Sequence, residues 1–254
     1  MHKITKDDLI NTGTHFGHIT SKTNPNFKDF VLSQKNGIDI INLDYTLKSL
    51  DKALSFIVEI VQNNGDVLFV GTKKHAKDVI QQEADRCGMY YVVERWLGGT
   101  LTNFSTIRKS IKRLHTLEKE GSSIYDDLTK KEILKLNREK LKLSDQHRGI
   151  KDMNRLPNVI VVVDGKTEHI VLEEAKKLEI PVVCIVDSNT DPSLCSFPIP
   201  ANDDSIRTIQ LLISEIVNAI ISVGKPEETK IDDSSVNSKD LNDSTNDEVK
   251  GAIQ

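Results

Sequence analysis

The sequence has 254 residues, of which 37% are hydrophobic and 28% charged, as expected of a mainly globular chain of one or two domains. No run approaches the ~20 uninterrupted apolar residues of a membrane span, and residues 1–10 lack the apolar segment of a secretory signal. The three cysteines, Cys87, Cys184 and Cys195, form no CxxC pair, which disfavours a disulfide framework and a cysteine zinc site. We expect reduced thiols in a cytosolic protein.

Charge is distributed unevenly along the chain. The formal net charge is −4, but residues 101–155 hold 14 lysines and arginines against 8 aspartates and glutamates. Residues 225–254 hold 4 lysines against 8 acidic residues, and they contain few apolar side chains. Local charge governs attraction to a polyanion, so residues 101–155 are a candidate nucleic-acid surface. Residues 225–254 are predicted to be a disordered acidic tail.

The first part of the chain alternates between helical and strand patterns. Residues 1–36 are mixed, with a turn signal at Asn24-Pro25. Apolar spacing predicts a helix over 43–61, with Asp44 as its N-cap and Asn64-Gly65 as its stop. A short apolar run predicts a buried strand over 66–71. A helix over 73–87 and a strand over 90–93 follow.

The same alternation returns near the end of the chain. Strands are predicted over 158–163, 181–186 and 197–200, with helices over 167–178 and 204–223. The proline-flanked strand 197–200 suits only a sheet edge, and Asp203 or Asp204 is the expected cap of the last helix. Continuously apolar strands between helices predict a parallel sheet covered on both faces. This α/β body comprises residues 1–100 and 156–224.

Residues 101–155 differ in kind from this body. They carry one apolar stripe at helical spacing and two leucine pairs spaced by seven: Ile107, Ile111, Leu114 and Leu117; Leu134 with Leu141; Leu136 with Leu143. Thr129 and Glu132 fit a capping box. The pattern predicts an antiparallel coiled-coil helical hairpin, inserted between two strands and covered by basic side chains. A solvated coiled-coil surface is the alternative interpretation of those charges.

Several motifs, in order, resemble one family. They include His15-Phe-Gly-His18, Leu68-Phe-Val-Gly-Thr-Lys73, Arg95-Trp-Leu-Gly-Gly99, Leu101-Thr-Asn-Phe104 and Val186-Asp-Ser-Asn-Thr-Asp-Pro192. The set spans roughly residues 5–223 and resembles the bacterial-type small-subunit ribosomal proteins of the S-two family. The resemblance implies a flavodoxin-like sheet with a protruding coiled-coil hairpin, no catalysis and no cofactor. It also implies a cytoplasmic, ribosome-bound protein that contacts ribosomal RNA between head and body and neighbouring small-subunit proteins, including the S-one protein.

Polar and basic side chains in and beside the hairpin are the candidate RNA contacts. Arg95 suits a bidentate phosphate contact, whereas Trp96 suits either base stacking or, more commonly at a strand end, core packing. Phosphate and sugar contacts position a protein without reading sequence, so we expect recognition of RNA shape. The predicted RNA-binding residues are Lys73, Arg95, Trp96, Asn103, Thr106, Arg108, Lys109, Lys112, Arg113, Lys130 and Lys131.

Binding of a nucleotide or sugar phosphate is the alternative to RNA binding. The turn Gly71-Thr72-Lys73-Lys74 lacks the spacing of a Walker loop and of GxGxxG, which favours an RNA-backbone contact or a structural turn over nucleotide binding. The alternative function is a flavodoxin-like enzyme or binding module for a nucleotide or sugar phosphate. It would require a complete phosphate loop or an acid–base pair, and the sequence displays neither.

A group of histidines and aspartates is expected at the carboxyl ends of the strands. It comprises His15, His18, Asp187, Asp203 and Asp204. Two histidines and several carboxylates suit a divalent metal, but a hydrogen-bonded polar cluster with helix caps is the alternative. We therefore assign no metal ligand.

Overall fold

The computed structural model describes residues 4–119 and 128–224. The predicted acidic tail, residues 225–254, lies outside this part of the chain, as do residues 120–127 of the predicted hairpin.

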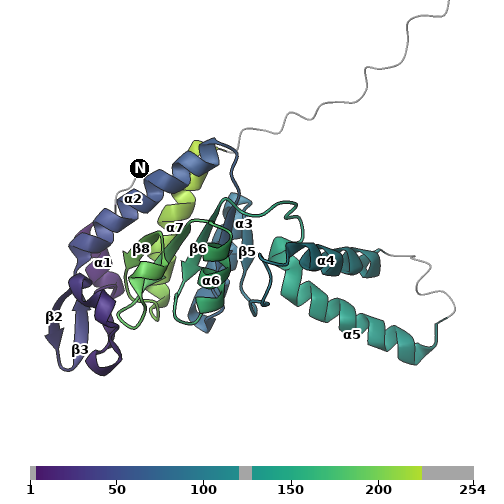
Figure 1. Ribbon diagram of the computed structural model, residues 1–254, viewed down its shortest axis with the longest axis horizontal. Helices are drawn as coiled ribbons and strands as arrows, with labels where there is room; N and C mark the ends of the chain where they lie inside the picture. The colour runs from purple at the N-terminus through teal and green to yellow at the C-terminus, as the bar shows by residue number, and fades with distance from the viewer. Residues whose placement is uncertain (1–3, 120–127, 225–254) are drawn as a thin grey trace, which may run out of the picture.

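A parallel sheet of five strands forms the centre of the body (Figure 1). Its strands are β4 (Val67–Val70), β5 (Tyr90–Val92), β6 (Val159–Val163), β7 (Val182–Val186) and β8 (Phe197–Pro200). The order is β5-β4-β6-β7-β8, which is 2-1-3-4-5 along the chain, as in doubly wound sheets of the flavodoxin type. Every residue of β4, β6 and β7 is buried, because helices cover both faces. The predicted parallel sheet is confirmed, with β8 at its edge.

Alternate residues of each strand enter separate cores. In the first core, on one face of the sheet, Phe69 and Val161 pack with α2 (Leu43–Gln62), α3 (Lys74–Cys87) and α7 (Ile206–Val223). In the second core, on the opposite face, Leu68 and Ile160 pack with Leu172 of α6 (His169–Lys177). Burying apolar area contributes about 25 cal/mol per Å², so these two cores provide the main drive for folding. The prediction of helices on both faces is confirmed.

Helix α7 meets the length and hydropathy of a membrane span, with a mean hydropathy of 1.5. Its buried residues include Leu212, Ile213 and Ile216, and they belong to the first core. Core helices of globular proteins commonly pass this test, so it is weak evidence for a membrane segment.

A second, antiparallel sheet precedes the parallel sheet in the chain. After α1 (Lys6–Thr12), the strands β1 (Phe16–Ile19), β2 (Val31–Lys35) and β3 (Ile38–Ile41) pair in the order β1-β3-β2. Short 3₁₀ turns, Thr20–Lys22 and Pro25–Phe30, connect β1 to β2. The sequence did not predict these strands, because they are short and none of them is buried throughout, so they show no continuous buried apolar run.

Two predicted helix caps are wrong. Helix α2 is capped by Asn42, whose side chain accepts a hydrogen bond from the backbone N–H of Asp44 at 3.0 Å. Helix α7 is capped by Ser205, and neither Asp203 nor Asp204 serves as the cap. Asn42 and Ser205 are the caps because their side chains accept hydrogen bonds from backbone N–H groups of the first helical turn.

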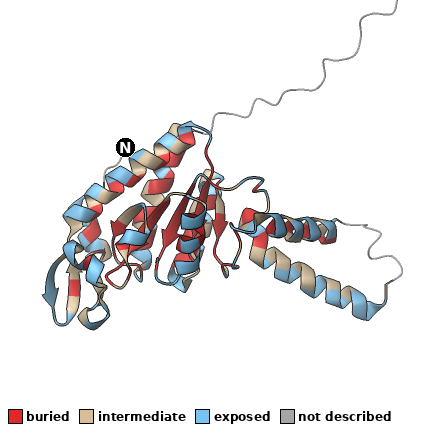
Figure 2. Ribbon diagram, viewed as in Figure 1, coloured by how far each residue is buried: buried red, intermediate tan, exposed pale blue. Residues whose placement is uncertain are grey.

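Helices α4 (Phe104–Glu118) and α5 (Lys130–His147) lie between β5 and β6 in the chain, and they project side by side from the body (Figure 1). Leu114 and Leu117 of α4 are buried but belong to neither sheet core, so α5 covers them. Most of α5 is exposed, in contrast to the body (Figure 2). The predicted capping box of Thr129 and Glu132 is present.

Candidate functional site

Charged side chains gather beyond the carboxyl ends of the parallel strands. Lys73 follows β4, Asp164 follows β6, Asp187 follows β7, and Asp203 with Asp204 follows β8. Strands β4 and β6 flank the point at which the strand order reverses, where sheets of this type commonly bind ligands. The fold therefore brings together charges that are up to 131 residues apart in the sequence.

Lys73 lies at the centre of this cluster. Its Nζ is 2.9 Å from Asp164 Oδ2 and 2.8 Å from the Oδ1 atoms of Asp203 and Asp204. Asp164 and Asp203 are 1% and 0% exposed. Burial alone would lower the pKa of Lys73, but the surrounding carboxylates raise it. The Lys73 ammonium is thus bound to three carboxylates, which neutralise its charge.

His18 extends the cluster. Its Nδ1 is 2.8 Å from Asp187 Oδ2, and its Nε2 is 3.6 Å from Asp204 Oδ2. The hydrogen bond with Asp187 raises the pKa of His18 despite the opposing effect of burial. His15 is not part of this group, and burial lowers its pKa.

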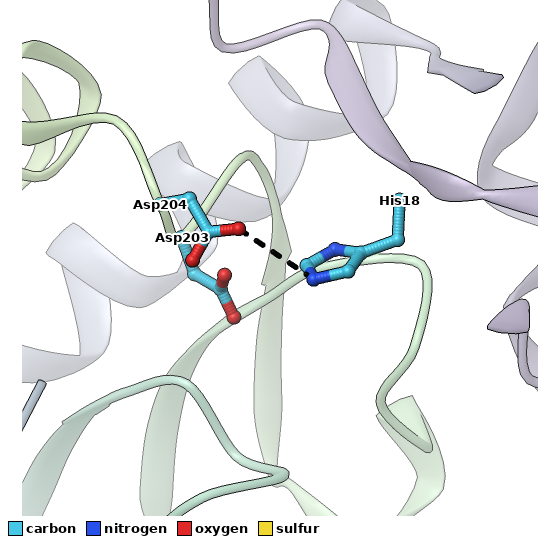
Figure 3. A group of neighbouring side chains, drawn as sticks. All are labelled: His18, Asp203 and Asp204. Atoms are coloured by element: carbon cyan, nitrogen blue, oxygen red, sulfur yellow. Dashed lines mark ion pairs between the residues drawn. The ribbon is translucent and has the colours of Figure 1, made fainter.

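The hydrogen-bonded polar cluster also has the spacing of a cation site. Ligand atoms of His18, Asp203 and Asp204 all lie within 4.8 Å of one another (Figure 3). Asp203 Oδ2 is buried and has no hydrogen-bond partner among the described residues. These nitrogen and oxygen donors are of the kind that divalent transition metals accept. Lys73 binds Oδ1 of both aspartates, and Asp204 Oδ2 faces His18 Nε2 at 3.6 Å.

The buried aspartate of this cluster predicts a pH dependence of stability. Burial and the charges of Asp164 and Asp187 outweigh Lys73 and raise the pKa of Asp203 to about 7. The native chain then retains a proton that the unfolded chain releases above about pH 4. The free energy of unfolding should therefore fall by about 1.4 kcal/mol per pH unit between pH 5 and pH 7. His18, whose pKa is also raised, contributes in the same direction.

Urea unfolding in chelator-containing buffer at pH 5, 6, 7 and 8 measures this slope. Asp203→Asn should reduce the slope to the part that His18 contributes, because asparagine does not titrate. A wild-type stability that is constant or rises across this range would contradict the assignment.

A cavity of about 400 Å³ adjoins the cluster. It is lined by Thr72, Lys77, Glu94, Arg95, Trp96, Thr167, Glu168 and Ile170. Glu168 accepts hydrogen bonds from the backbone N–H and the hydroxyl of Thr72, at 3.0 and 2.5 Å. Lys77 is paired with Glu94 at 2.7 Å. The other two charges of the lining, Arg95 and Glu168, are of opposite sign, so the cavity has no excess positive charge for a nucleotide or sugar phosphate.

The connection from β5 to α4 is tied to the body by Glu174 of α6. This carboxylate accepts hydrogen bonds from the Trp96 indole and from Gly99, Leu101 and Thr102. Burial alone would raise the pKa of Glu174, but these hydrogen bonds outweigh it and lower the pKa. Sequence reasoning missed Glu174. The available signal was a glutamate on the apolar side of its helix, next to Ala175 and three residues after Val171.

The predicted RNA-binding residues fall into three groups. Trp96 is 6% exposed and packs in the second core, and Lys73 is bound in the carboxylate cluster. Arg108 donates to the backbone and side-chain oxygens of Asn154 at 2.6 and 3.2 Å. The remaining residues are exposed: Arg95, Asn103, Thr106, Lys109, Lys112, Arg113, Lys130 and Lys131.

The exposed cations differ in their partners. Arg113 is paired with Glu139 at 3.0 Å. Lys109, Lys112, Lys130 and Lys131 form no ion pair within residues 4–119 and 128–224. Four lysines on two projecting helices are therefore available to an anionic partner.

Comparison with known proteins identifies the family. The family model described as ribosomal protein S2 matches residues 9–223. Three proteins named small ribosomal subunit protein uS2 are each 52% identical to the chain over 222 residues. They come from Bifidobacterium longum strains DJO10A and NCC 2705 and from Bifidobacterium longum subsp. infantis, and the match covers 87% of this chain and 79% of each relative. The chain therefore belongs to the ribosomal protein S2 family, whose members are structural ribosomal proteins and not enzymes.

Proposed function

We propose that the chain is a structural component of the small ribosomal subunit that binds ribosomal RNA through the exposed basic side chains of α4 and α5. The observation that carries this proposal is the set of lysines on the two projecting helices that have no ion pair within the described residues. Family membership supports the assignment to the small ribosomal subunit, since the relatives are named as small-subunit proteins. The net positive charge of residues 101–155 supplies the attraction to phosphate.

The proposed contact surface, here called the basic surface, consists of Arg95, Asn103, Thr106, Lys109, Lys112, Arg113, Lys130 and Lys131. Lys109 and Lys112 are three residues apart and so lie on the same side of α4. Arg95 and Asn103 flank the connection into that helix. The basic surface excludes Trp96 and Lys73, because one is buried and the other is bound to three carboxylates.

The domain division follows from the same proposal. Residues 101–155 act as an inserted antiparallel coiled-coil hairpin that carries the RNA contacts, and residues 1–100 with 156–224 form the body. We infer that the body presents surfaces to neighbouring small-subunit proteins, among them the S-one protein. The small sheet supports a protein-binding role, since Phe16, Ile19 and Leu32 are 47%, 54% and 65% exposed. The protein then resides on cytoplasmic ribosomes.

Charge reversal on α4 tests RNA binding. The triple variant Lys109→Glu, Lys112→Glu, Arg113→Glu should rebind more weakly to small ribosomal subunits depleted of this protein. Each lost phosphate contact reduces the log–log salt slope of binding by about 0.7–0.9, so three contacts reduce it by about 2–3. Co-sedimentation across a salt series measures both the affinity and the slope.

The matched control reverses three exposed lysines of the body, Lys166, Lys176 and Lys177, to glutamate. It changes the net charge equally but leaves the basic surface intact. If both triple variants bound like the wild type, or weakened equally, the basic surface would not be the RNA contact.

A further inference from the structure

A single buried carboxylate holds the connection from β5 to α4. Glu174 is 5% exposed. Its Oε1 accepts hydrogen bonds from the Trp96 indole N–H at 3.1 Å and from the Gly99 backbone N–H at 2.7 Å. Its Oε2 accepts from the backbone N–H groups of Leu101 and Thr102, both at 3.0 Å, and from the Thr102 hydroxyl at 3.1 Å. All five donors come from one short stretch of chain that is 72–78 residues earlier in the sequence.

The chemistry of this contact requires an ionised carboxylate. A carboxylate is purely an acceptor with about four lone-pair sites, so it can satisfy donors on both oxygens. Glutamine at the same position would direct an NH₂ group at one of the two sets of donors. Leu101 is only 2% exposed, so its N–H has no access to water when it loses this acceptor. Glu174 therefore fixes the connection relative to α6 and to the sheet beneath it.

The connection determines where the basic surface lies. Arg95 stands at its beginning and Asn103 at its end, directly before α4. Because a helix is stiff and rises about 1.5 Å per residue, Lys112 lies about 12 Å along the axis from the start of α4. A small rotation at that start therefore displaces the lysine far more than it displaces Arg95.

We propose that Glu174 is a positioning residue for RNA binding: it sets the direction of α4, so that Arg95 and the lysines of α4 meet one RNA surface together. This inference rests on the proposed function. Glu174 itself touches no RNA in this arrangement, because it is buried beneath the connection that it holds.

The test compares Glu174→Gln with Glu173→Gln in the full-length chain. Glu173 is the preceding residue of α6, is exposed, and undergoes the same chemical change. We expect amide hydrogen exchange at Gly99, Leu101 and Thr102 to accelerate at least tenfold in Glu174→Gln, with unchanged exchange in β6. Affinity for depleted small ribosomal subunits should fall about tenfold relative to Glu173→Gln.

The outcomes separate this inference from the proposed function. Faster exchange with wild-type affinity would show that Glu174 holds the connection but does not position the basic surface, and would overturn the inference. Unchanged amide exchange at Gly99, Leu101 and Thr102 would show that Glu174 does not fix the connection, and would also overturn the inference. If the charge-reversal triple variant also failed to weaken binding, both the proposed function and the role of Glu174 would be contradicted. If that triple variant did weaken binding, only the positioning role of Glu174 would be contradicted.

A gentler variant covers the case in which Glu174→Gln fails to fold. Trp96→Phe removes one donor and leaves the carboxylate with the other four. It should shift exchange and affinity in the same directions by about twofold to threefold. A folded Trp96→Phe protein with faster exchange at Gly99 and undiminished affinity would also overturn the inference.

Discussion

Replacing Lys73 by methionine is expected to lower the free energy of unfolding by about 3–5 kcal/mol, because the change leaves buried carboxylates without their cation. Asp164 and Asp203 are almost fully buried, and both are within 2.9 Å of the Lys73 ammonium. Methionine retains the length of the side chain but provides no donor. The two carboxylates would then repel each other in a poorly solvated site, or bind protons that they do not hold at neutral pH in the unfolded chain.

Chemical denaturation at pH 7.5 measures this loss. Lys74→Met is the matched control, since Lys74 is the next residue, exposed, and placed at the start of α3. It should change stability by less than about 0.5 kcal/mol. Adding Asp203→Asn to Lys73→Met should restore part of the lost stability, because the two groups interact directly. A Lys73→Met protein as stable as the control would show that the carboxylates do not depend on this lysine.

Replacing Gly149 by alanine is expected to disrupt the attachment of α5 to the sheet. Gly149 lies in the 3₁₀ turn that follows α5, and an added Cβ would stand 2.2 Å from the backbone oxygen of Tyr91 in β5. The Tyr91 ring atoms Cδ2 and Cγ would be 2.5 and 2.7 Å away. A backbone oxygen cannot rotate away as a flexible side chain does, so the turn or the strand must move. Such overpacking costs about 1–3 kcal/mol.

Gly98→Ala provides the control, since a Cβ at that position meets no atom within 4 Å. Thermal unfolding of the two variants gives the difference in stability, and amide exchange in β5 shows whether the strand has moved. Binding to depleted small subunits should also weaken in Gly149→Ala, because α5 would change direction with the turn. Equal stability of Gly149→Ala and Gly98→Ala would contradict the close packing of the turn on β5.

The sequence was sufficient where local pattern and burial coincide. Strands β4, β6 and β7 are continuous apolar runs, and a parallel sheet covered on both faces requires such runs. The ordered motifs were also sufficient for the family, which the comparisons confirm. By contrast, β1 and β2 contain no buried residue, so neither apolar alternation nor continuity marked them.

The tertiary structure decided which charged side chains remain available. Lys73 and Lys112 look equally suitable for phosphate in the sequence, but the fold surrounds Lys73 with three carboxylates from two other loops and leaves Lys112 exposed. Trp96 and Glu174 are likewise brought together from distant segments. Sequence alone thus determined the strands of the parallel sheet, most helices and the basic segment, because these follow from periodicity and composition. Which groups neutralise one another depends on contacts between residues far apart in the chain, and only folding creates those contacts.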